Sequence, residues 1–181
     1  MDVVQEEKIY TIEDIYALPD GERAELIDGK IYFMSSPNVD HERICKKLIR
    51  TIDDYIEGNN GNCESFIAPC AVFLNNDNTT YVEPDVFVVC DPNKIDNKGC
   101  HGAPDWIIEV VSPSSRTLDY LIKANKYHDA GVKEYWIVDP RDKQVTVYNF
   151  EDEMTISSYH FGEDIPVGIY SGFSIMLPSN L

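Results

Sequence analysis

Several features that mark common protein classes are missing from this sequence. No apolar run approaches the roughly 20 residues that cross a bilayer, and the stretch MDVVQEEKIY lacks the basic and apolar regions of a secretory signal. No internal repeat, linker or low-complexity segment is present. We therefore expect a cytoplasmic protein without membrane contact, folded as one domain over residues 1–181.

Cysteine pairs of the kind that bind zinc are also missing. The five cysteines are odd in number, and none belongs to a Cys-x-x-Cys motif. This pattern is typical of reduced thiols in the core and loops of a cytoplasmic protein, and it argues against a zinc site. The cysteines are Cys45, Cys63, Cys70, Cys90 and Cys100.

Basic residues are scarce. The chain has 15 Lys and Arg against 32 Asp and Glu, which gives a net charge of −17. A non-specific nucleic-acid binder should be basic, so this composition argues against that class. The acidic composition is compatible with an enzyme that binds divalent cations at a carboxylate cluster. For most of the acidic residues, solubility is sufficient explanation.

Hydrophobic periodicity predicts an α/β fold with a mixed sheet. Asp28-Gly29 is a strong two-residue turn signal between apolar stretches, and Pro69 indicates an edge strand or a bulge. The predicted elements are a helix at 11–18, a hairpin around 24–34, a helix at 40–57, strands at 65–74, 81–90 and 105–111, a polar loop at 91–103, a helix from Ser114 or Ser115 to about 130, and two antiparallel strands in KEYWIVDP and QVTVYNF. The expected parts are an N-terminal helix and hairpin (11–36), a core (38–150) and a C-terminal cover (151–181).

Two of the predicted apolar strands each contain an embedded carboxylate. Asp85 lies in YVEPDVFVVC and Glu109 in WIIEVV. A buried charge without a partner is costly. If the two strands are neighbours, both carboxylates converge near one edge of the sheet. A divalent cation such as Mg²⁺, which takes carboxylate and carbonyl oxygens, would then offset the cost of burial.

The helix after these strands adds a cationic side chain. Asp119, Lys123 and Tyr127 are spaced i, i+4, i+8 and share one helix face. Lys123 could reach over the sheet edge and orient a water nucleophile or stabilise charge on a phosphoryl group. Alternatively, Lys123 forms only an exposed pair with Asp119. Spacing alone leaves both interpretations open, and Tyr127 reads most simply as a core aromatic residue.

These residues lie in stretches that resemble the Uma-type family of restriction-endonuclease-like proteins, within the PD-(D/E)xK nuclease superfamily. The resemblance implies an αβββαβ core, elaborated by the N-terminal hairpin and the C-terminal β cover. The matching stretches occur in the family's order and cover most of residues 11–150; they include AELIDGKIYFMSSP, DHERI, VEPDVFVVCDP and GAPDWIIEVVSPSSRTLDYLIKANKYHDAGVKEYWIVDP.

The resemblance also assigns the motif residues. Asp85 is the aspartate of the "PD" and Glu109 is the "(D/E)". The motif lysine two residues after Glu109 would fall at Val111, which cannot serve, and Lys123 matches a lysine moved to the following helix. Two further residues match family positions near the same site: Glu25 and His41.

The resemblance implies a Mg²⁺-dependent nuclease, with Mn²⁺ as a substitute and DNA as the expected substrate. Asp85 and Glu109 would hold the ion, with the backbone carbonyl of Val110 as a third ligand. Lys123 would position the attacking water. The remaining two site residues, Glu25 and His41, would complete the shell or assist proton transfer. A homodimer is expected by analogy with nucleases that pair two sites on a duplex.

Each assignment has a simpler alternative. Glu109 could form an ion pair with a basic residue of a neighbouring helix, Glu25 could be an exposed strand residue, and His41 could be hydrogen-bonded locally at its helix start. Asp105, in a second Pro-Asp, reads as a strand-entry residue. Two other functions stay open for the whole chain. One is a non-cleaving binding or assembly module, and the other is a metal-dependent hydrolase of a small phosphorylated metabolite.

Overall fold

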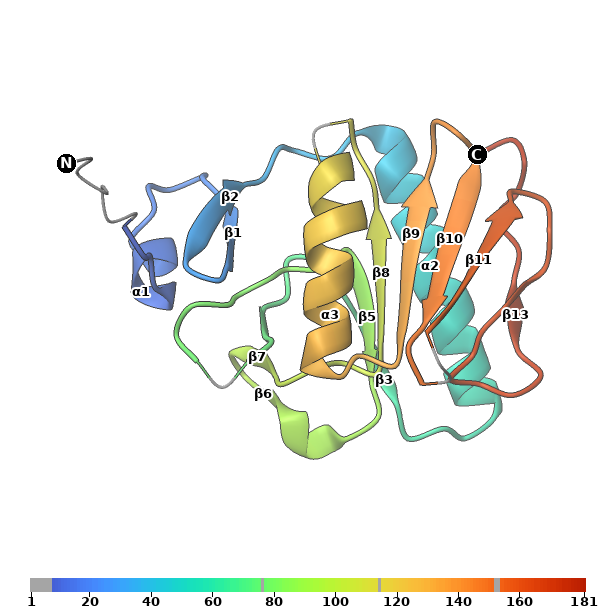
Figure 1. The fold of residues 1–181 in the computed structure, drawn as a ribbon. Helices are drawn as coiled ribbons and strands as arrows, with labels where there is room; N and C mark the ends of the chain where they lie inside the picture. Colours follow the sequence, from blue (N-terminus) through green and yellow to red (C-terminus); the bar gives the residue numbers. More distant parts are fainter. Residues whose placement is uncertain (1–7, 76, 114, 152–153) are drawn as a thin grey trace.

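The computed structural model describes residues 8–75, 77–113, 115–151 and 154–181. Its centre is a six-stranded mixed sheet in the order β11-β10-β9-β8-β5-β3, with α2 on one face and α3 on the other (Figure 1). Only the β8–β9 pair of this sheet is parallel. The chain order α2-β3-β5-β8-α3-β9 confirms the predicted αβββαβ core. The bounds are α2 Val39–Gly58, β3 Glu64–Ile67, β5 Val86–Val89, β8 Trp106–Val110, α3 Ala124–Ala130, β9 Glu134–Asp139, β10 Gln144–Asn149 and β11 Thr155–His160.

Helix α2 forms where the sequence predicts it. The Asn38 side chain caps its first turn by accepting a hydrogen bond from the backbone N–H of His41 at 2.9 Å. Ile44, Leu48 and Ile52 recur at helical spacing and are fully buried against the sheet. None of the described helices is both long and apolar enough to cross a membrane.

The second helix differs from its prediction at its beginning. It opens with a π-helical segment, η2 (Leu118–Lys123), before α3 continues to a left-handed Gly131 with φ 91°. Wider π turns are rare and occur frequently at functional sites. Of the two predicted cap residues, Ser114 lies outside the described residues, and the backbone oxygen of Ser115 accepts from the N–H of Asp119 at 2.9 Å.

Two predicted strands are shorter than expected. The first is broken at the cis Ala68–Pro69 peptide, and β3 is the edge strand of the sheet, as Pro69 indicated. The second enters the sheet only at Val86, because Tyr81 pairs with Leu26 of the N-terminal hairpin instead. The stretch 91–103, predicted as a polar loop, contains short regular elements. That stretch contains η1 (Pro92–Lys94), β6 (Ile95–Asp96) and β7 (Gly99–His101), and β7 pairs with β4 (Val72–Phe73).

The N-terminal and C-terminal parts cover the sheet from two sides. The hairpin turns at Asp28 and Gly29, which both have positive φ, and it packs with α1 in a separate apolar cluster. C-terminal residues complete the core on the α2 face, as the predicted cover requires. The bounds are α1 Ile12–Tyr16, β1 Ala24–Ile27, β2 Lys30–Phe33, β12 Ile165–Pro166 and β13 Ser174–Ile175.

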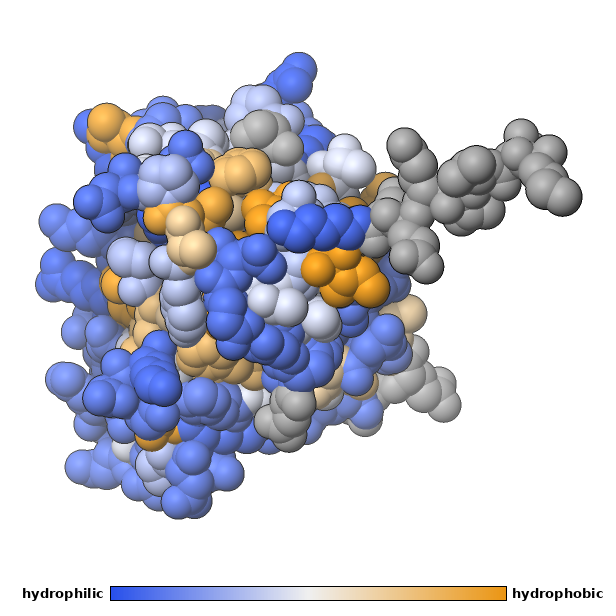
Figure 2. All heavy atoms as spheres, turned by 90° about the vertical axis from the view of Figure 1, so that its left-hand side faces the viewer, coloured by the Kyte–Doolittle hydropathy of each residue, from blue (hydrophilic) through white to orange (hydrophobic). Residues whose placement is uncertain are grey.

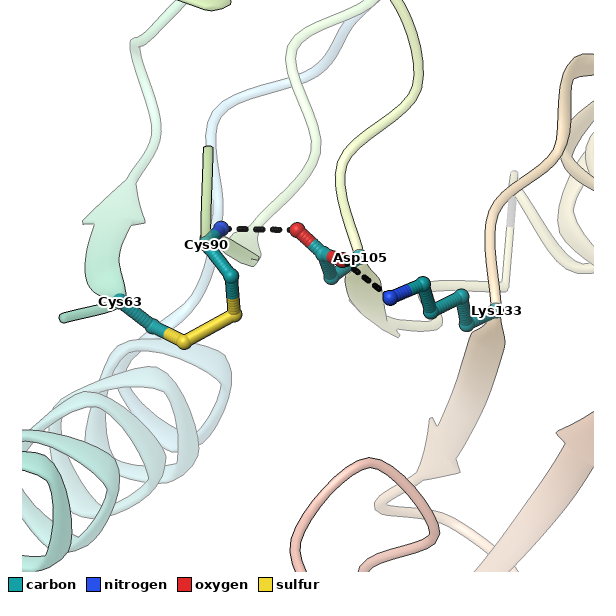
Figure 3. Close-up of a disulfide and its surroundings, with 4 residues drawn as sticks. All are labelled: Cys63, Cys90, Asp105 and Lys133. Carbon is teal, nitrogen blue, oxygen red and sulfur yellow. Dashed lines mark hydrogen bonds and ion pairs between the residues drawn. A yellow bond between two sulfur atoms is a disulfide. The ribbon is translucent and has the colours of Figure 1, made fainter. Parts of the chain in front are cut away.

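The expectation that all cysteines are reduced is wrong for two of them. Cys63 and Cys90 form a disulfide, because the antiparallel pairing of Glu64 with Val89 places these neighbours opposite each other. Figure 3 shows the bond beside the Asp105 carboxylate, which accepts from the backbone N–H of Cys90 at 2.7 Å. The number and spacing of cysteines carry no information about strand register, so the sequence could not predict this bond. Cys45, Cys70 and Cys100 are free thiols.

Reduction of this disulfide is expected to lower the free energy of unfolding by about 3 kcal/mol, because the bond closes a long loop of the unfolded chain. The two cysteines are 27 residues apart in sequence. Urea unfolding of the oxidised and the reduced protein measures the difference. Cys70→Ser is the control and should unfold like the unmodified protein under both conditions. Identical curves for the oxidised and reduced protein would refute the assignment.

Candidate active site

The two embedded carboxylates meet where β8 ends and β5 begins. These strands are antiparallel neighbours, with Val86 opposite Ile108, as the sequence argument required. The backbone N–H of Val110 donates to Asp85 Oδ2 at 2.8 Å. The backbone N–H of Asp85 lies 3.4 Å from Glu109 Oε2. The sheet itself therefore holds Asp85 and Glu109 next to each other.

Lys123 joins this pair from the helix on the α3 face. Its Nζ lies 2.9 Å from Glu109 Oε1, and its side chain is buried. Asp119 Oδ1 lies 3.6 Å from the same nitrogen and is also buried, so the alternative of an exposed Lys123–Asp119 pair is wrong. The other alternative was an ion pair of Glu109 with a basic helix residue. That ion pair is present, with Lys123, but it is one contact of a larger cluster.

Glu25 completes the contacts of the lysine. Its Oε2 lies 2.7 Å from Lys123 Nζ, and its Oε1 accepts from the backbone N–H of Glu83 at 3.0 Å. Every residue of β1 is buried, so the alternative of an exposed strand residue is wrong for Glu25. Three carboxylates, those of Glu25, Glu109 and Asp119, thus share one ammonium group.

His41 reaches the site from the first turn of α2. Its Nε2 lies 3.1 Å from Asp85 Oδ2, so the local hydrogen bonds predicted as an alternative, which are also present, do not describe all of its contacts. Burial lowers the pKa of His41, but the hydrogen bond and charge of Asp85, with the charges of Glu42 and Asp119, outweigh burial and raise it. The imidazolium form is therefore stabilised beside Asp85.

The electrostatics of the cluster show an excess of negative charge. Burial, together with the charges of Asp85, Asp119 and Glu25, raises the pKa of Glu109 well above its ordinary value, although Lys123 opposes the shift. Burial also raises the pKa of Asp119. Burial opposes the charged form of Lys123, yet the surrounding carboxylates raise its pKa well above the ordinary value. A further cation would relieve this imbalance.

One hydrogen-bond donor of the site was not predicted from the sequence. Tyr127, interpreted as a core aromatic residue, is buried and donates its hydroxyl hydrogen bond to Glu109 Oε1 at 2.8 Å. Its spacing from Lys123 is the signal that could have revealed this role, because i and i+4 share a helix face. Tyr127 and Lys123 together fix one oxygen of Glu109 and leave Oε2 facing Asp85.

Tyr127→Phe is expected to lower the free energy of unfolding by about 1–3 kcal/mol, because a buried charged acceptor loses a hydrogen bond. Urea unfolding at neutral pH measures the loss. Tyr120→Phe, on the same helix but only partly buried, is the matched control and should change stability far less. Equal losses in the two variants would argue against the hydrogen bond to Glu109.

A cleft of about 650 Å³ opens above the cluster. The hairpin, the start of α2, the end of β8 and η2 form its walls. Figure 2 shows the hairpin side of the molecule, where hydrophilic side chains cover most of the surface and apolar ones lie in small patches. The cleft is lined by the thiol of Cys45, the phenol of Tyr32 and the acidic and basic side chains of Arg23, Glu25, His41, Glu42, Asp85, Glu109, Asp119 and Lys123.

The donor chemistry of the site fits a hard divalent cation. Asp85 and Glu109 offer carboxylate oxygens at the base of the cleft, and Val110 lines the same cleft. Asp105, the second Pro-Asp, is not part of this arrangement. It lies at the beginning of β8, where its Oδ1 pairs with Lys133 Nζ at 2.9 Å (Figure 3).

Known proteins agree with this architecture. An uncharacterized protein of Synechocystis sp. is 28% identical over 133 residues, which are 73% of this chain and 68% of that protein. A crystal structure described as a "putative nuclease belonging to DUF820" from Anabaena variabilis superposes with a TM-score of 0.71 at 21% identity. The superposition covers 92% of this chain and 94% of that one, and it shows a common fold. Residues 12–177 match the Uma2 family, whose description is "putative restriction endonuclease", and the chain belongs to that family.

Proposed function

We propose that this protein is a divalent-metal-dependent nuclease that hydrolyses phosphodiester bonds, with DNA as the expected substrate. The observation that carries the proposal is the buried cluster in which Glu25, Glu109 and Asp119 share Lys123, next to Asp85, under an open cleft. The descriptions of the family and of the Anabaena structure support the same class of reaction.

Asp85 and Glu109 would hold Mg²⁺ or Mn²⁺, with the backbone carbonyl of Val110 as a further ligand. A bound divalent cation stabilises negative charge on a phosphate oxygen and lowers the pKa of bound water. The crowding of carboxylates supports this assignment, because an added cation compensates charges that the protein's own basic groups leave in excess.

The chain's own residues would carry the remaining steps. Lys123, fixed between Glu25 and Glu109, would orient the attacking water and stabilise developing charge at the phosphate. Asp85 stabilises the protonated form of His41, which would deliver its proton to the leaving oxygen. The cleft would admit the scissile phosphate while the rest of the substrate lies outside.

A small phosphate ester is the second candidate substrate, and the size of the cleft favours it. Small-molecule sites typically measure about 300–1,000 Å³, and the cleft here measures about 650 Å³. The net charge of −17 also disfavours the long-range attraction of DNA. Cleavage assays with plasmid DNA, single-stranded oligonucleotides and bis(p-nitrophenyl) phosphate separate the two substrates.

Calorimetric titration of Mn²⁺ is expected to give a binding heat that Asp85→Asn abolishes, because the variant loses a charged oxygen ligand. Asp105→Asn is the matched control, since it changes the second Pro-Asp at the other end of β8. This control should retain the heat. Circular dichroism checks that both variants fold.

Two results of that titration would count against the enzyme. The absence of Mn²⁺ binding in the unmodified protein, with and without a DNA oligonucleotide, would favour the non-cleaving binding or assembly module. Equal loss of heat in Asp85→Asn and Asp105→Asn would place the ion elsewhere. Light scattering on the same samples tests the homodimer that analogy suggests.

A further inference from the structure

A second group of side chains of the kinds that bind metals lies beside the nuclease cluster, the name used here for Glu25, Asp85, Glu109, Asp119 and Lys123. His41 and Cys45 are spaced i, i+4 on α2, so both side chains leave the same helix face. Their Nδ1 and Sγ atoms are 3.6 Å apart. With Asp85 they form a set in which one donor atom of each residue lies within 4.8 Å of the others.

We propose that His41, Cys45 and Asp85 bind one zinc-class cation. Imidazole nitrogen, thiolate sulfur and carboxylate oxygen are the usual zinc ligands, and three of them with an open fourth position form the catalytic type of site. Thiolate and imidazole select such ions over Mg²⁺. The proposal replaces the expectation against zinc, which rested on the absence of Cys-x-x-Cys pairs and could not anticipate ligands from a helix and a strand.

Two of the three donor atoms are already at the separation that a zinc-class ion requires. Zinc–ligand bonds of about 2.0–2.3 Å place the donors of a tetrahedral site about 3.3–3.8 Å apart. The helix already holds Nδ1 and Sγ at that separation. Asp85 now contacts the other ring nitrogen, Nε2, at 3.1 Å, so its side chain has to turn from Nε2 to reach an ion bound at Nδ1. Both His41 and Asp85 have side chains that are 15% exposed, and all three residues line the cleft, so an ion can enter.

The same three residues could instead be a nucleophile, a base and an orienting acid, but the state of the thiol argues against this. Burial, and then the charges of Asp85, Glu42 and Glu109, raise the pKa of Cys45. Cys45 is also only 2% exposed. A neutral, buried thiol is a poor nucleophile, whereas a metal ion displaces its proton on binding.

The two ions would share Asp85. A zinc-class ion would therefore compete with Mg²⁺, or Asp85 would bridge both. It would also bind His41 and so remove the proton donor of the proposed cleavage, so we expect it to inhibit that reaction. This consequence for cleavage rests on the proposed function, but the zinc-class site does not, because Cys45 and His41 bind without Glu109.

Titration with Co²⁺ as a probe tests the site without measuring activity. A thiolate bound to Co²⁺ gives a charge-transfer band in the near ultraviolet, which an oxygen-only site lacks. The oxidised protein should show this band. The band should be lost in Cys45→Ser. In His41→Gln the affinity of the protein for Co²⁺ should fall at least tenfold. Cys70→Ser, which removes a free thiol elsewhere, should retain it, and Zn²⁺ should displace Co²⁺ in competition.

Several outcomes would overturn the proposal. They are the absence of a band in the unmodified protein, a band that persists in folded Cys45→Ser, and an unchanged Co²⁺ affinity in folded His41→Gln. Glu109→Gln separates this proposal from the nuclease. It should keep the cobalt band while it loses the Mn²⁺ heat. Loss of the cobalt band in folded Glu109→Gln would place the ion in the nuclease cluster and refute a separate site.

Discussion

Lys123→Met is expected to lower the free energy of unfolding by about 3–5 kcal/mol, because it removes one partner of a buried charge cluster. Methionine keeps the length and volume of the side chain but not the charge. The carboxylates of Glu25, Glu109 and Asp119 then lose the ammonium group that they share in the buried cluster. Urea unfolding followed by circular dichroism measures the change.

The loss should depend on pH with a definite sign. Burial already raises the pKa of Glu109 and of Asp119, and Lys123 opposes both shifts. Without Lys123 the folded state therefore binds more protons at these two groups than the unfolded state. Stability then rises as pH falls. The difference from the unmodified protein should be largest near about pH 8 and smaller near about pH 5.

Lys126→Met is the matched control for this prediction. Lys126 lies on the same helix but pairs with Asp28, which is exposed at the hairpin turn. Ion pairs of this kind contribute about 0–1 kcal/mol. Equal losses in Lys123→Met and Lys126→Met, or a loss in Lys123→Met that grows with acid, would contradict the cluster as described.

Glu109→Gln is expected to reduce cleavage by about 10²–10³-fold, because it removes charge that would hold the metal at the reacting phosphate. The same change should leave the free energy of unfolding unchanged or increase it. Glutamine removes a buried charge that burial already disfavours, and Lys123 keeps Glu25 at 2.7 Å. Single-turnover cleavage with Mg²⁺ and urea unfolding of the same preparation measure both quantities.

For a buried carboxylate outside the cluster, we expect a loss of stability and no change in the cleavage rate. Glu134 accepts hydrogen bonds from Trp136 Nε1 at 2.6 Å and from the backbone N–H of Ile169 at 2.9 Å. Glu134→Gln should therefore lower stability while folded protein keeps its cleavage rate. A Glu109→Gln protein that is less stable but fully active would assign Glu109 a structural role.

The sequence predicts those elements whose residue pattern lies within one continuous stretch of the chain. The apolar stripe of α2 and the Asp28–Gly29 turn are local patterns, and both elements form where they predict. The embedded positions of Asp85 and Glu109 required neighbouring strands, which the structure confirms. The family resemblance added Lys123, which spacing alone left ambiguous.

Features that depend on contacts between distant stretches could not be predicted. The burial of Glu25 follows from packing of the hairpin onto the rest of the chain, and the Cys63–Cys90 bond follows from strand register. The short strand β7 depends on pairing with β4 and on the buried Cys100, and β6 in turn pairs with β7, in a stretch whose composition is that of a loop. The hydroxyl of Tyr127 has a partner only because Glu109 lies below its helix.

Because of the π-helical segment Leu118–Lys123, this helix can lose one residue and keep its site side chains. A π turn is equivalent to one residue inserted into an α-helix. Leu121 lies within it and is 62% exposed, so its deletion removes no core side chain. The shortened helix would regain α geometry and keep Lys123 aligned with Tyr127, while Asp119 and Lys123 would lie three positions apart and still share one face. A related chain that is one residue shorter here is therefore expected to keep both the lysine and its aspartate partner.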